Sequence, residues 1–412
     1  MRVRRIGSAA AAAGLGALLC VTAATPASAT PRSWEYQALG LAAAQRTAQG
    51  EGITVAVLDS GVMKDHPAVA GRVTTGPDYF KDGLHPGDSR WGGHGTAMAS
   101  DVLKVAPKAR ILSVRVIDDK KEHSGLRHGP SPVAEGIDYA VDHGARVISM
   151  SLGGELFGRE FNEDETDALA RATQKGIPVI ASAGNDAEVF NETSFPAGYP
   201  EVIAVAATQQ GGSRAAFSTV RTYNAVAAPG VGIVSAKNTG GYEAVSGTSP
   251  AAALTSGTVA LMLSRNHRLT PAQVRAVLTK TAHHPSGGYS PLVGYGQINA
   301  AAAVRAAAHP PTVATTPAKF HGNEHPAGQD GTSKTTHPSL ETGMTTVGYS
   351  AAGVGLAMVL GAVLIGVLGR RKTRAQGAPT GPTGPMGPMG PIGPTGPAPA
   401  FPAQAPPPGS PY

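Results

Sequence analysis

The stretch Val245-Ser246-Gly247-Thr248-Ser249-Pro250-Ala251-Ala252-Ala253 joins a turn of small residues to an apolar helical pattern that continues through Leu263. Pro250 stands where the first turn of a helix accepts proline, because an N–H at that position would have no partner. Ser249 is therefore predicted at a helix N-terminus, where free N–H groups and the positive end of the dipole can stabilise a developing oxyanion. Such turns are common, so a nucleophile also requires a base and a carboxylate elsewhere in the chain.

Two stretches upstream supply these candidate partners. In residues 53–61, Ile-Thr-Val-Ala-Val-Leu-Asp-Ser-Gly, an apolar run ends in an acid and a glycine turn, which predicts Asp59 at the carboxyl end of a buried strand. In residues 92–99, Gly-Gly-His-Gly-Thr-Ala-Met-Ala, His94 stands between glycines at the start of a helix-like segment. Each motif alone is more often structural than catalytic, because short motifs match by chance.

A fourth element lies between these stretches and Ser249. Residues 179–183 form an apolar run, and Gly184 and Asn185 follow it directly. An asparagine amide beyond the end of a strand can donate a hydrogen bond to an oxyanion. Taken alone, Asn185 is better explained as a turn residue, so its candidacy depends on the other three motifs.

The four motifs are Asp59-Ser60-Gly61, His94-Gly95-Thr96, Ala183-Gly184-Asn185 and Gly247-Thr248-Ser249. Together, and in the chain order Asp, His, Ser, they resemble the subtilisin-like serine peptidases, or subtilases, of family S8. The resemblance covers about residues 50–308. It implies an α/β fold of three layers, in which a mostly parallel sheet is covered by helices on both faces.

The resemblance also implies a role for each site residue. Asp59 would orient His94, His94 would act as general base, and Ser249 would attack the peptide carbonyl. Asn185 and the Ser249 backbone N–H would form the oxyanion hole. Further residues would bind the substrate: Ser151, Leu152, Gly153, Ala183 and Gly184, with Ser194 in the primary specificity pocket. No cofactor and no metal ligand are expected in this site.

The pattern of apolar runs agrees with a parallel sheet, because continuous apolar strands alternate with helical segments. Strands are predicted at 53–58, 111–116, 147–152, 179–182 and 202–207. Helices are predicted at 132–143, 163–175, 249–264, from residue 270 onward and at about 299–308. The segment 249–264 is apolar on all sides, which predicts a buried central helix.

The charge of the chain is concentrated at its two ends. The net charge is +6, but seven positive charges lie at Arg2, Arg4, Arg5, Arg370, Arg371, Lys372 and Arg374. The remaining residues therefore carry about −1, which argues against nucleic-acid binding. The single cysteine, Cys20, lies in the N-terminal apolar stretch, so the mature protein is expected to contain neither a disulfide nor a cysteine-based metal site.

The N-terminal residues predict export. A basic start, an apolar stretch and Ala27-Ser28-Ala29 indicate a signal peptide over 1–29 that is cleaved after Ala29. Residues 30–50 are too few to fold as a separate inhibitory propeptide, so we expect a short arm packed on the peptidase domain, which spans 51–309.

The C-terminal residues predict a membrane anchor. A linker rich in Pro, Thr, Gly and Ser covers 310–346, and an apolar run at 347–369 is long enough to span a bilayer. The basic cluster that follows predicts a cytoplasmic tail over 370–412, which is rich in Gly and Pro. The protein is thus expected to be a single-pass membrane protein with an extracytoplasmic peptidase domain.

An anchored, exported subtilase with a short arm is similar to the mycosins, the peptidases associated with type VII secretion. This resemblance implies a polypeptide substrate, processing of exported proteins, and the secretion machinery as a partner. The chain departs from the group in lacking disulfides, and it carries Pro250 where the family commonly has Met, Phe or Tyr. A catalytically dispensable scaffold of a secretion complex and a general cell-surface protease remain as alternatives.

Many subtilases hold calcium in a loop inserted into the helix after the catalytic histidine. Here residues 94–107 continue directly toward the next predicted strand, and Asp101 is the only carboxylate among them. A calcium site needs several oxygen ligands. We therefore expect no high-affinity calcium at this position.

Overall fold

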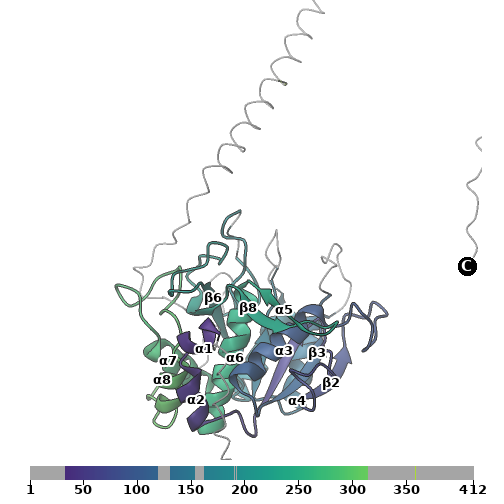
Figure 1. The fold of residues 1–412 in the computed structure, drawn as a ribbon, viewed down its shortest axis with the longest axis horizontal. Helices are drawn as coiled ribbons and strands as arrows, with labels where there is room; N and C mark the ends of the chain where they lie inside the picture. The colour runs from purple at the N-terminus through teal and green to yellow at the C-terminus, as the bar shows by residue number, and fades with distance from the viewer. Residues whose placement is uncertain are drawn as a thin grey trace, which may run out of the picture. The chain divides into compact units, whose positions relative to one another are not determined.

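A parallel sheet lies between two layers of helices in the part of the chain that the structure describes (Figure 1). The structure is a computed structural model and describes residues 33–118, 130–153, 162–189, 191, 193–313 and 358. The helices of this part are α1 (Trp34–Ala38), α2 (Leu41–Thr47), α3 (Gly93–Val105), α4 (Pro132–Asp142), α5 (Glu163–Gln174), α6 (Thr248–Arg265), α7 (Pro271–Thr281) and α8 (Ala300–Ala306). The strands are β1 (Thr54–Asp59), β2 (Val73–Asp78), β3 (Arg110–Arg115), β4 (Val147–Met150), β5 (Val179–Ser182), β6 (Val202–Thr208), β7 (Asn224–Pro229), β8 (Ile233–Ala236) and β9 (Tyr242–Val245).

The main sheet has seven strands in the order β2-β3-β1-β4-β5-β6-β7, and all of its pairings are parallel. The side chains of the interior strand β1 alternate between two cores. Val55 and Val57 pack into one apolar cluster, whereas Ala56 and Leu58 pack into another on the opposite face. A strand that is apolar on both sides must be covered on both sides, which is why β1 reads as a continuous apolar run.

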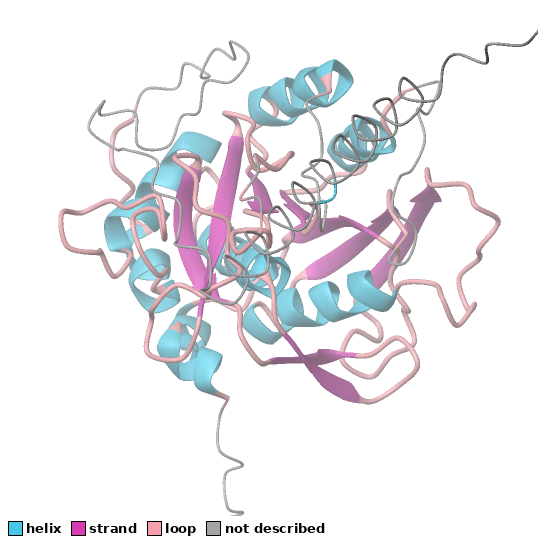
Figure 2. Ribbon diagram, turned by 90° about the horizontal axis from the view of Figure 1, so that it is seen from above, coloured by secondary structure: helices cyan, strands magenta, loops and turns pink. Residues whose placement is uncertain are grey.

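Helices cover both faces, as the sequence predicts. The larger core combines the sheet with residues of α2, α3, α6, α7 and α8, and the second core combines it with α4 and α5. Seen from above, the helices lie on either side of the strands (Figure 2). The predicted three-layer α/β fold is therefore confirmed.

Helix α6 is the buried central helix that the sequence predicts. From Pro250 to Leu263 all of its residues are buried, and it packs against α3 and strands β4 to β7. Its few polar side chains are satisfied locally: Thr255 and Thr258 each donate to the carbonyl four residues earlier. Ser256 also donates to Ser149 Oγ of β4 at 2.8 Å, which fixes the helix against the sheet.

Several elements were missed by the sequence pattern. Strand β2 is an edge strand with exposed and half-buried residues, and it contains glycine and proline. Strands β8 and β9 form a short antiparallel hairpin, and only β8 is mostly buried. Strand β7 is fully buried, but five of its six residues are alanine, asparagine or proline. None of these four strands has the long continuous apolar run on which the prediction relied.

Residues 34–47, which form α1 and α2, pack against α3 and the segment that precedes β8. The Trp34 indole donates to the Val231 carbonyl at 3.1 Å, and Glu35 pairs with Lys104 of α3 at 3.0 Å. Gln45 Nε2 donates to the Lys104 and Val105 carbonyls at 2.9 Å each. The arm therefore satisfies carbonyl groups at the end of α3 that have no partner within the helix.

The predicted signal peptide, most of the linker, the tail and the apolar run 347–369, except for Met358, lie outside the described residues. Within the described ranges, no helix combines the length and the apolar character that crossing a membrane requires.

Candidate active site

The predicted site residues gather at one edge of the sheet. Asp59 is the last residue of β1, Ser151 follows β4 by one residue, and Asn185 follows β5 by three. These strands are neighbours in the order β1-β4-β5, so their carboxyl ends lie side by side. Strands β3 and β2 lie on one side of β1, and β4 to β7 lie on the other. The direction in which strands are added to the sheet therefore reverses beside β1, and ligands bind parallel sheets at such a switch point.

Asp59 and His94 form a hydrogen-bonded pair. His94 Nδ1 lies 2.8 Å from Asp59 Oδ1 and 3.0 Å from Asp59 Oδ2. The Asp59 side chain is fully buried, whereas the His94 side chain is 32% exposed. An ionised carboxylate only accepts, so Nδ1 carries the proton and Nε2 is the nitrogen that can accept one.

Glycines allow this approach of α3 to β1. A Cβ on Gly95 would lie 2.0 Å from the Gly61 carbonyl oxygen and 3.1 Å from Asp59 Cβ. The Gly95 backbone N–H also donates to Ser60 Oγ at 3.1 Å. Only a residue without a side chain fits at position 95, which explains the glycine beside the histidine.

Ser249 lies in the first turn of α6, and a neighbouring strand end holds it. Ser151 Oγ donates to the Ser249 carbonyl oxygen at 3.0 Å. Ser249 is half-buried and follows Gly247 and Thr248, of which Gly247 is in an extended conformation. The predicted placement at a helix N-terminus is therefore confirmed.

The amide of Asn185 is fixed by Thr248. Asn185 Oδ1 accepts from the Thr248 backbone N–H at 2.8 Å and from Thr248 Oγ1 at 2.9 Å. Its Nδ2 lies 3.5 Å from the position that a Cβ on Gly247 would occupy. With its oxygen engaged, the amide presents its NH₂ group as a donor beside the turn that carries Ser249. The sequence motif contained Thr248, but nothing in the sequence indicated that it orients Asn185.

The predicted substrate-binding segments also lie together. Ser182 Oγ donates to the Leu152 carbonyl at 2.9 Å and joins the end of β5 to residues 151–153. Gly153 approaches Ser194, since a Cβ at 153 would lie 3.1 Å from Ser194 Oγ. Ser194 is 2% exposed, and its hydroxyl has no hydrogen-bond partner within the described ranges. Gly184 approaches the same residue at its Cβ.

The far end of α3 carries a second cluster of charges. Burial raises the pKa of Asp101 to about 6, while the nearby Lys104 ammonium acts in the opposite direction.

Helix α3 runs from Gly93 to Val105 without an inserted loop. Among the described residues, no group of three or more His, Cys, Asp or Glu side chains is arranged to hold a metal ion.

Comparison with known proteins adds the evolutionary context. Residues 50–296 match the model of the subtilase family. Thermitase of Thermoactinomyces vulgaris is 36% identical over 268 residues, which cover 63% of this chain and 90% of thermitase. Subtilisin E of Bacillus subtilis is 35% identical over 270 residues, covering 62% and 66% of the two chains.

Solved structures give the same result at the level of the fold. The crystal structure of MycP1 from Mycobacterium smegmatis is 28% identical, with a TM-score of 0.57, and the match covers 72% of this chain and 91% of MycP1. The MycP3 protease from the type VII (ESX-3) secretion system is 29% identical with a TM-score of 0.55, covering 66% and 88%. Mycosins are thus among the structural neighbours of this chain.

Proposed function

We propose, from the premise that the chain belongs to the subtilase family and is a serine endopeptidase, that Asp59, His94 and Ser249 carry out its reaction. The observation that supports this assignment best is the pairing of His94 Nδ1 with the buried Asp59 carboxylate at 2.8 Å. A histidine whose Nδ1–H is bonded to a carboxylate can act as a base through Nε2.

The reaction proceeds through an acyl-enzyme. His94 Nε2 takes the proton from Ser249 Oγ as that oxygen attacks the carbonyl carbon of the scissile bond. Asp59 stabilises the imidazolium that forms, and His94 then gives the proton to the leaving amine. A water molecule, deprotonated by His94, attacks the acyl carbon and releases the second product and the serine hydroxyl.

Two donors stabilise the negative oxygen of each tetrahedral intermediate. One is the Asn185 amide, whose oxygen is held by Thr248, and the other is the backbone N–H of Ser249 at the start of α6. Donors that are fixed before the reaction need no rearrangement as charge develops. The peptide substrate lies along residues 151–153 as an added strand, with Ala183 and Gly184 opposite and Ser194 in the primary specificity pocket.

The cellular role that we propose is that of a mycosin, an anchored peptidase that processes exported proteins beside a type VII secretion machinery. Its support is the likeness to MycP1 and MycP3, together with the predicted signal peptide 1–29 and anchor 347–369. In this arrangement the peptidase domain is extracytoplasmic and residues 370–412 are cytoplasmic. Protease added to intact protoplasts should remove the peptidase domain and spare an epitope placed after Gly377; loss of both would reject the arrangement.

The catalytic assignment is tested on the purified full-length chain. Ser249→Ala should lower kcat by about six orders of magnitude, as removal of the nucleophile does in this class. Asn185→Ala should lower kcat by about 10²–10³ through the oxyanion hole. The readouts are hydrolysis of a broad peptide library and labelling by a fluorophosphonate. A wild-type chain that neither cleaves nor becomes labelled would contradict the assignment.

The cellular requirement for catalysis is a separate question. A chromosomal Ser249→Ala strain should lose processing of at least one exported protein, measured by comparing the secreted proteomes of mutant and wild type. Full rescue of a deletion strain by the Ser249→Ala chain would instead support the scaffold alternative.

A further inference from the structure

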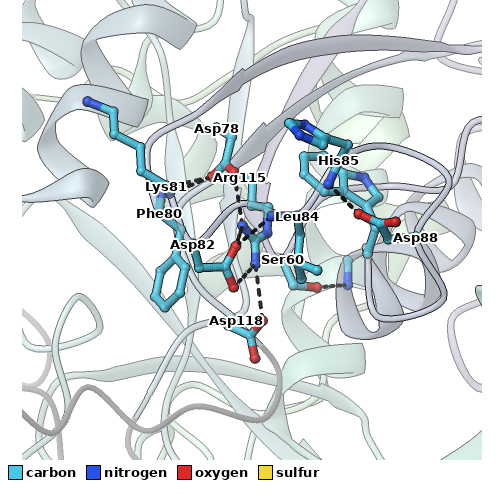
Figure 3. Close-up of polar contacts among 12 residues, drawn as sticks. Ser60, Asp78, Phe80, Lys81, Asp82, Leu84, His85, Asp88, Arg115 and Asp118 are labelled. Carbon is cyan, nitrogen blue, oxygen red and sulfur yellow. Dashed lines mark hydrogen bonds and ion pairs between the residues drawn. The ribbon is translucent and has the colours of Figure 1, made fainter. Parts of the chain in front are cut away.

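A buried arginine at the end of β3 gathers three carboxylates. Arg115 is 1% exposed. Its Nη1 donates to Asp78 Oδ2 at 3.0 Å and to Asp82 Oδ1 at 2.7 Å, and its Nη2 donates to Asp82 Oδ2 and Asp118 Oδ2 at 3.1 Å each. Figure 3 shows the three carboxylates directed at the guanidinium. A planar guanidinium with a fixed set of donors can hold several carboxylates in one geometry.

These carboxylates fasten the loop after β2 to the sheet. Asp78 is the last residue of β2, Asp82 lies in the following loop, and Asp118 follows β3. The loop is also braced internally, since Asp78 Oδ1 accepts from the backbone N–H of residues 80 and 81. Loops of this kind are otherwise the variable part of a fold. Here the arginine ties the loop to the end of β3.

The same arginine contacts Trp91, where the loop ends. The guanidinium carbon lies 5.1 Å from the centre of the Trp91 ring, within the range of a cation–π contact. Trp91 is 2% exposed and stands three residues before His94. A Cβ on Gly61 would lie 2.6 Å from the indole, so the backbone of the turn after Asp59 rests directly against this ring.

From Trp91, short contacts lead to both members of the Asp59–His94 pair. The next residue, Gly92, donates its backbone N–H to the Ser60 carbonyl at 3.1 Å. The Ser60 backbone N–H in turn donates to Asp59 Oδ1 at 2.7 Å. The indole thus lies against the turn that carries Asp59 and directly precedes the helix that carries His94.

We propose that Arg115 is a positioning residue for the peptidase reaction. Through Trp91 it holds the turn after β1 and the start of α3 at the separation that the Asp59–His94 hydrogen bond needs. This inference rests on the proposed function, because it assigns a consequence for rate to that pair. A displacement of about 1 Å in a reacting group lowers a rate by about 10²-fold, so a change of geometry in this contact has a measurable effect.

Two variants test the proposal in the full-length chain. Arg115→Lys keeps the charge but loses the planar set of donors, and Trp91→Phe keeps an aromatic face but removes the indole atoms that contact Gly61. Both should lower kcat per active site by about 10–100-fold while KM changes by less than about twofold. Active sites are counted by fluorophosphonate titration, so unfolded molecules do not contribute.

The matched control is Arg275→Lys, which changes an arginine far from the pair. Arg275 Nη2 donates to the Pro200 and Val202 carbonyls at 3.1 and 2.8 Å. The loss of these two hydrogen bonds in Arg275→Lys should lower Tm without changing kcat. The proton on His94 Nδ1 provides a second readout, because its downfield NMR resonance depends on the bond to Asp59. That resonance should move upfield in Arg115→Lys and stay in place in Arg275→Lys.

An unchanged kcat per active site in both Arg115→Lys and Trp91→Phe would overturn the proposal, even if both variants melt earlier. If Arg115→Lys does not fold, Trp91→Phe decides the matter alone. Failure of the proposed function looks different, because then the wild-type chain itself shows no hydrolysis and no titratable active site.

Discussion

Helix α3 carries a charged cluster at each end, and the two clusters differ in composition and surroundings. At its start, His94 pairs with the single carboxylate of Asp59 and remains 32% exposed. At its end, Lys104 Nζ lies 3.0 Å from Glu35 and 3.2 Å from Asp101, and both carboxylates are buried. One cluster pairs a histidine with one acid, whereas the other joins two acids to one ammonium.

The two clusters of α3 face different elements of the fold. The cluster at the start of α3 lies at the carboxyl edge of the sheet, beside the turns that carry Asn185 and Ser249. The cluster at its end lies between the N-terminal arm and the β8–β9 hairpin, where Ser235 Oγ donates to Asp101 and Lys104 donates to the Val234 carbonyl. The Asp59–His94 pair therefore faces the proposed site, whereas the ion pairs at the end of α3 face the arm and the hairpin.

The largest expected effect is on kcat, and it distinguishes the carboxylate of Asp59 from that of Asp101. Asp59→Asn should lower kcat by about 10⁴-fold, because an amide no longer fixes the histidine in the required tautomer. The free energy of unfolding should change much less than the activation free energy. Asp101→Asn is the control at the other end of α3 and should leave kcat within about twofold. Equal losses of kcat in both variants would remove the distinction between the clusters.

Removing the cation at the end of α3 should have the next largest effect. Lys104→Met leaves Asp101 and Glu35 buried without their partner, and breaking a buried ion pair in this way costs about 3–5 kcal/mol. Urea unfolding should show this loss, while kcat per active site should remain near the wild-type value. A loss below about 1 kcal/mol would mean that the cluster contributes little to stability.

Asp101 should also make stability depend on pH. Its folded pKa of about 6 lies above the ordinary value of 3.8, so the folded state binds an extra proton between these pH values. The free energy of unfolding therefore falls as pH rises from about 4 to 6, by about 3 kcal/mol from this group. Asp101→Asn should remove this slope, so its stability relative to wild type should improve between pH 4 and pH 7. Parallel pH profiles of the two proteins would contradict this expectation.

The smallest expected effect concerns calcium. Asp101 is the only carboxylate between His94 and Pro107, and it is occupied by Ser235 and Lys104. A ligand that binds only the folded state raises Tm according to its concentration and affinity. Thermal melts in EDTA and in millimolar calcium should therefore be nearly identical. A calcium-dependent rise that Asp101→Ala abolishes would place a site in α3, and one that persists would place it elsewhere.

The sequence predicted the parts of the fold that have one dominant pattern. Strands β1 and β5 are continuous apolar runs, and α6 is apolar on all sides, so their burial could be inferred directly. The edge strand β2 and the β8–β9 hairpin could not be found in this way, because their burial depends on neighbours that the sequence does not identify. Strand ends were uncertain by one or two residues, as β4 shows by ending at Met150 rather than at 152.

The candidate site shows the same limit. The motifs predict Asp59, His94 and Ser249 as site residues because each residue type is required by the chemistry. They did not indicate that Thr248 orients Asn185, nor that Arg115 reaches Trp91, because these contacts join segments far apart in the chain. Contacts between distant segments leave no periodic signal in a single sequence.

The separation of these segments along the chain has a consequence for the order in which the contacts form during folding. Asp59 and His94 are 35 residues apart and can meet early, whereas the contact of Ser151 with Ser249 spans 98 residues and needs the central helix in place. Distant contacts form slowly, because closing a long loop precedes the gain from packing. In a folding chain, Asp59 and His94 are therefore expected to meet before Ser151 holds Ser249. The proposed triad is then complete only late in folding, so we expect an unfinished chain to be unable to cut its neighbours.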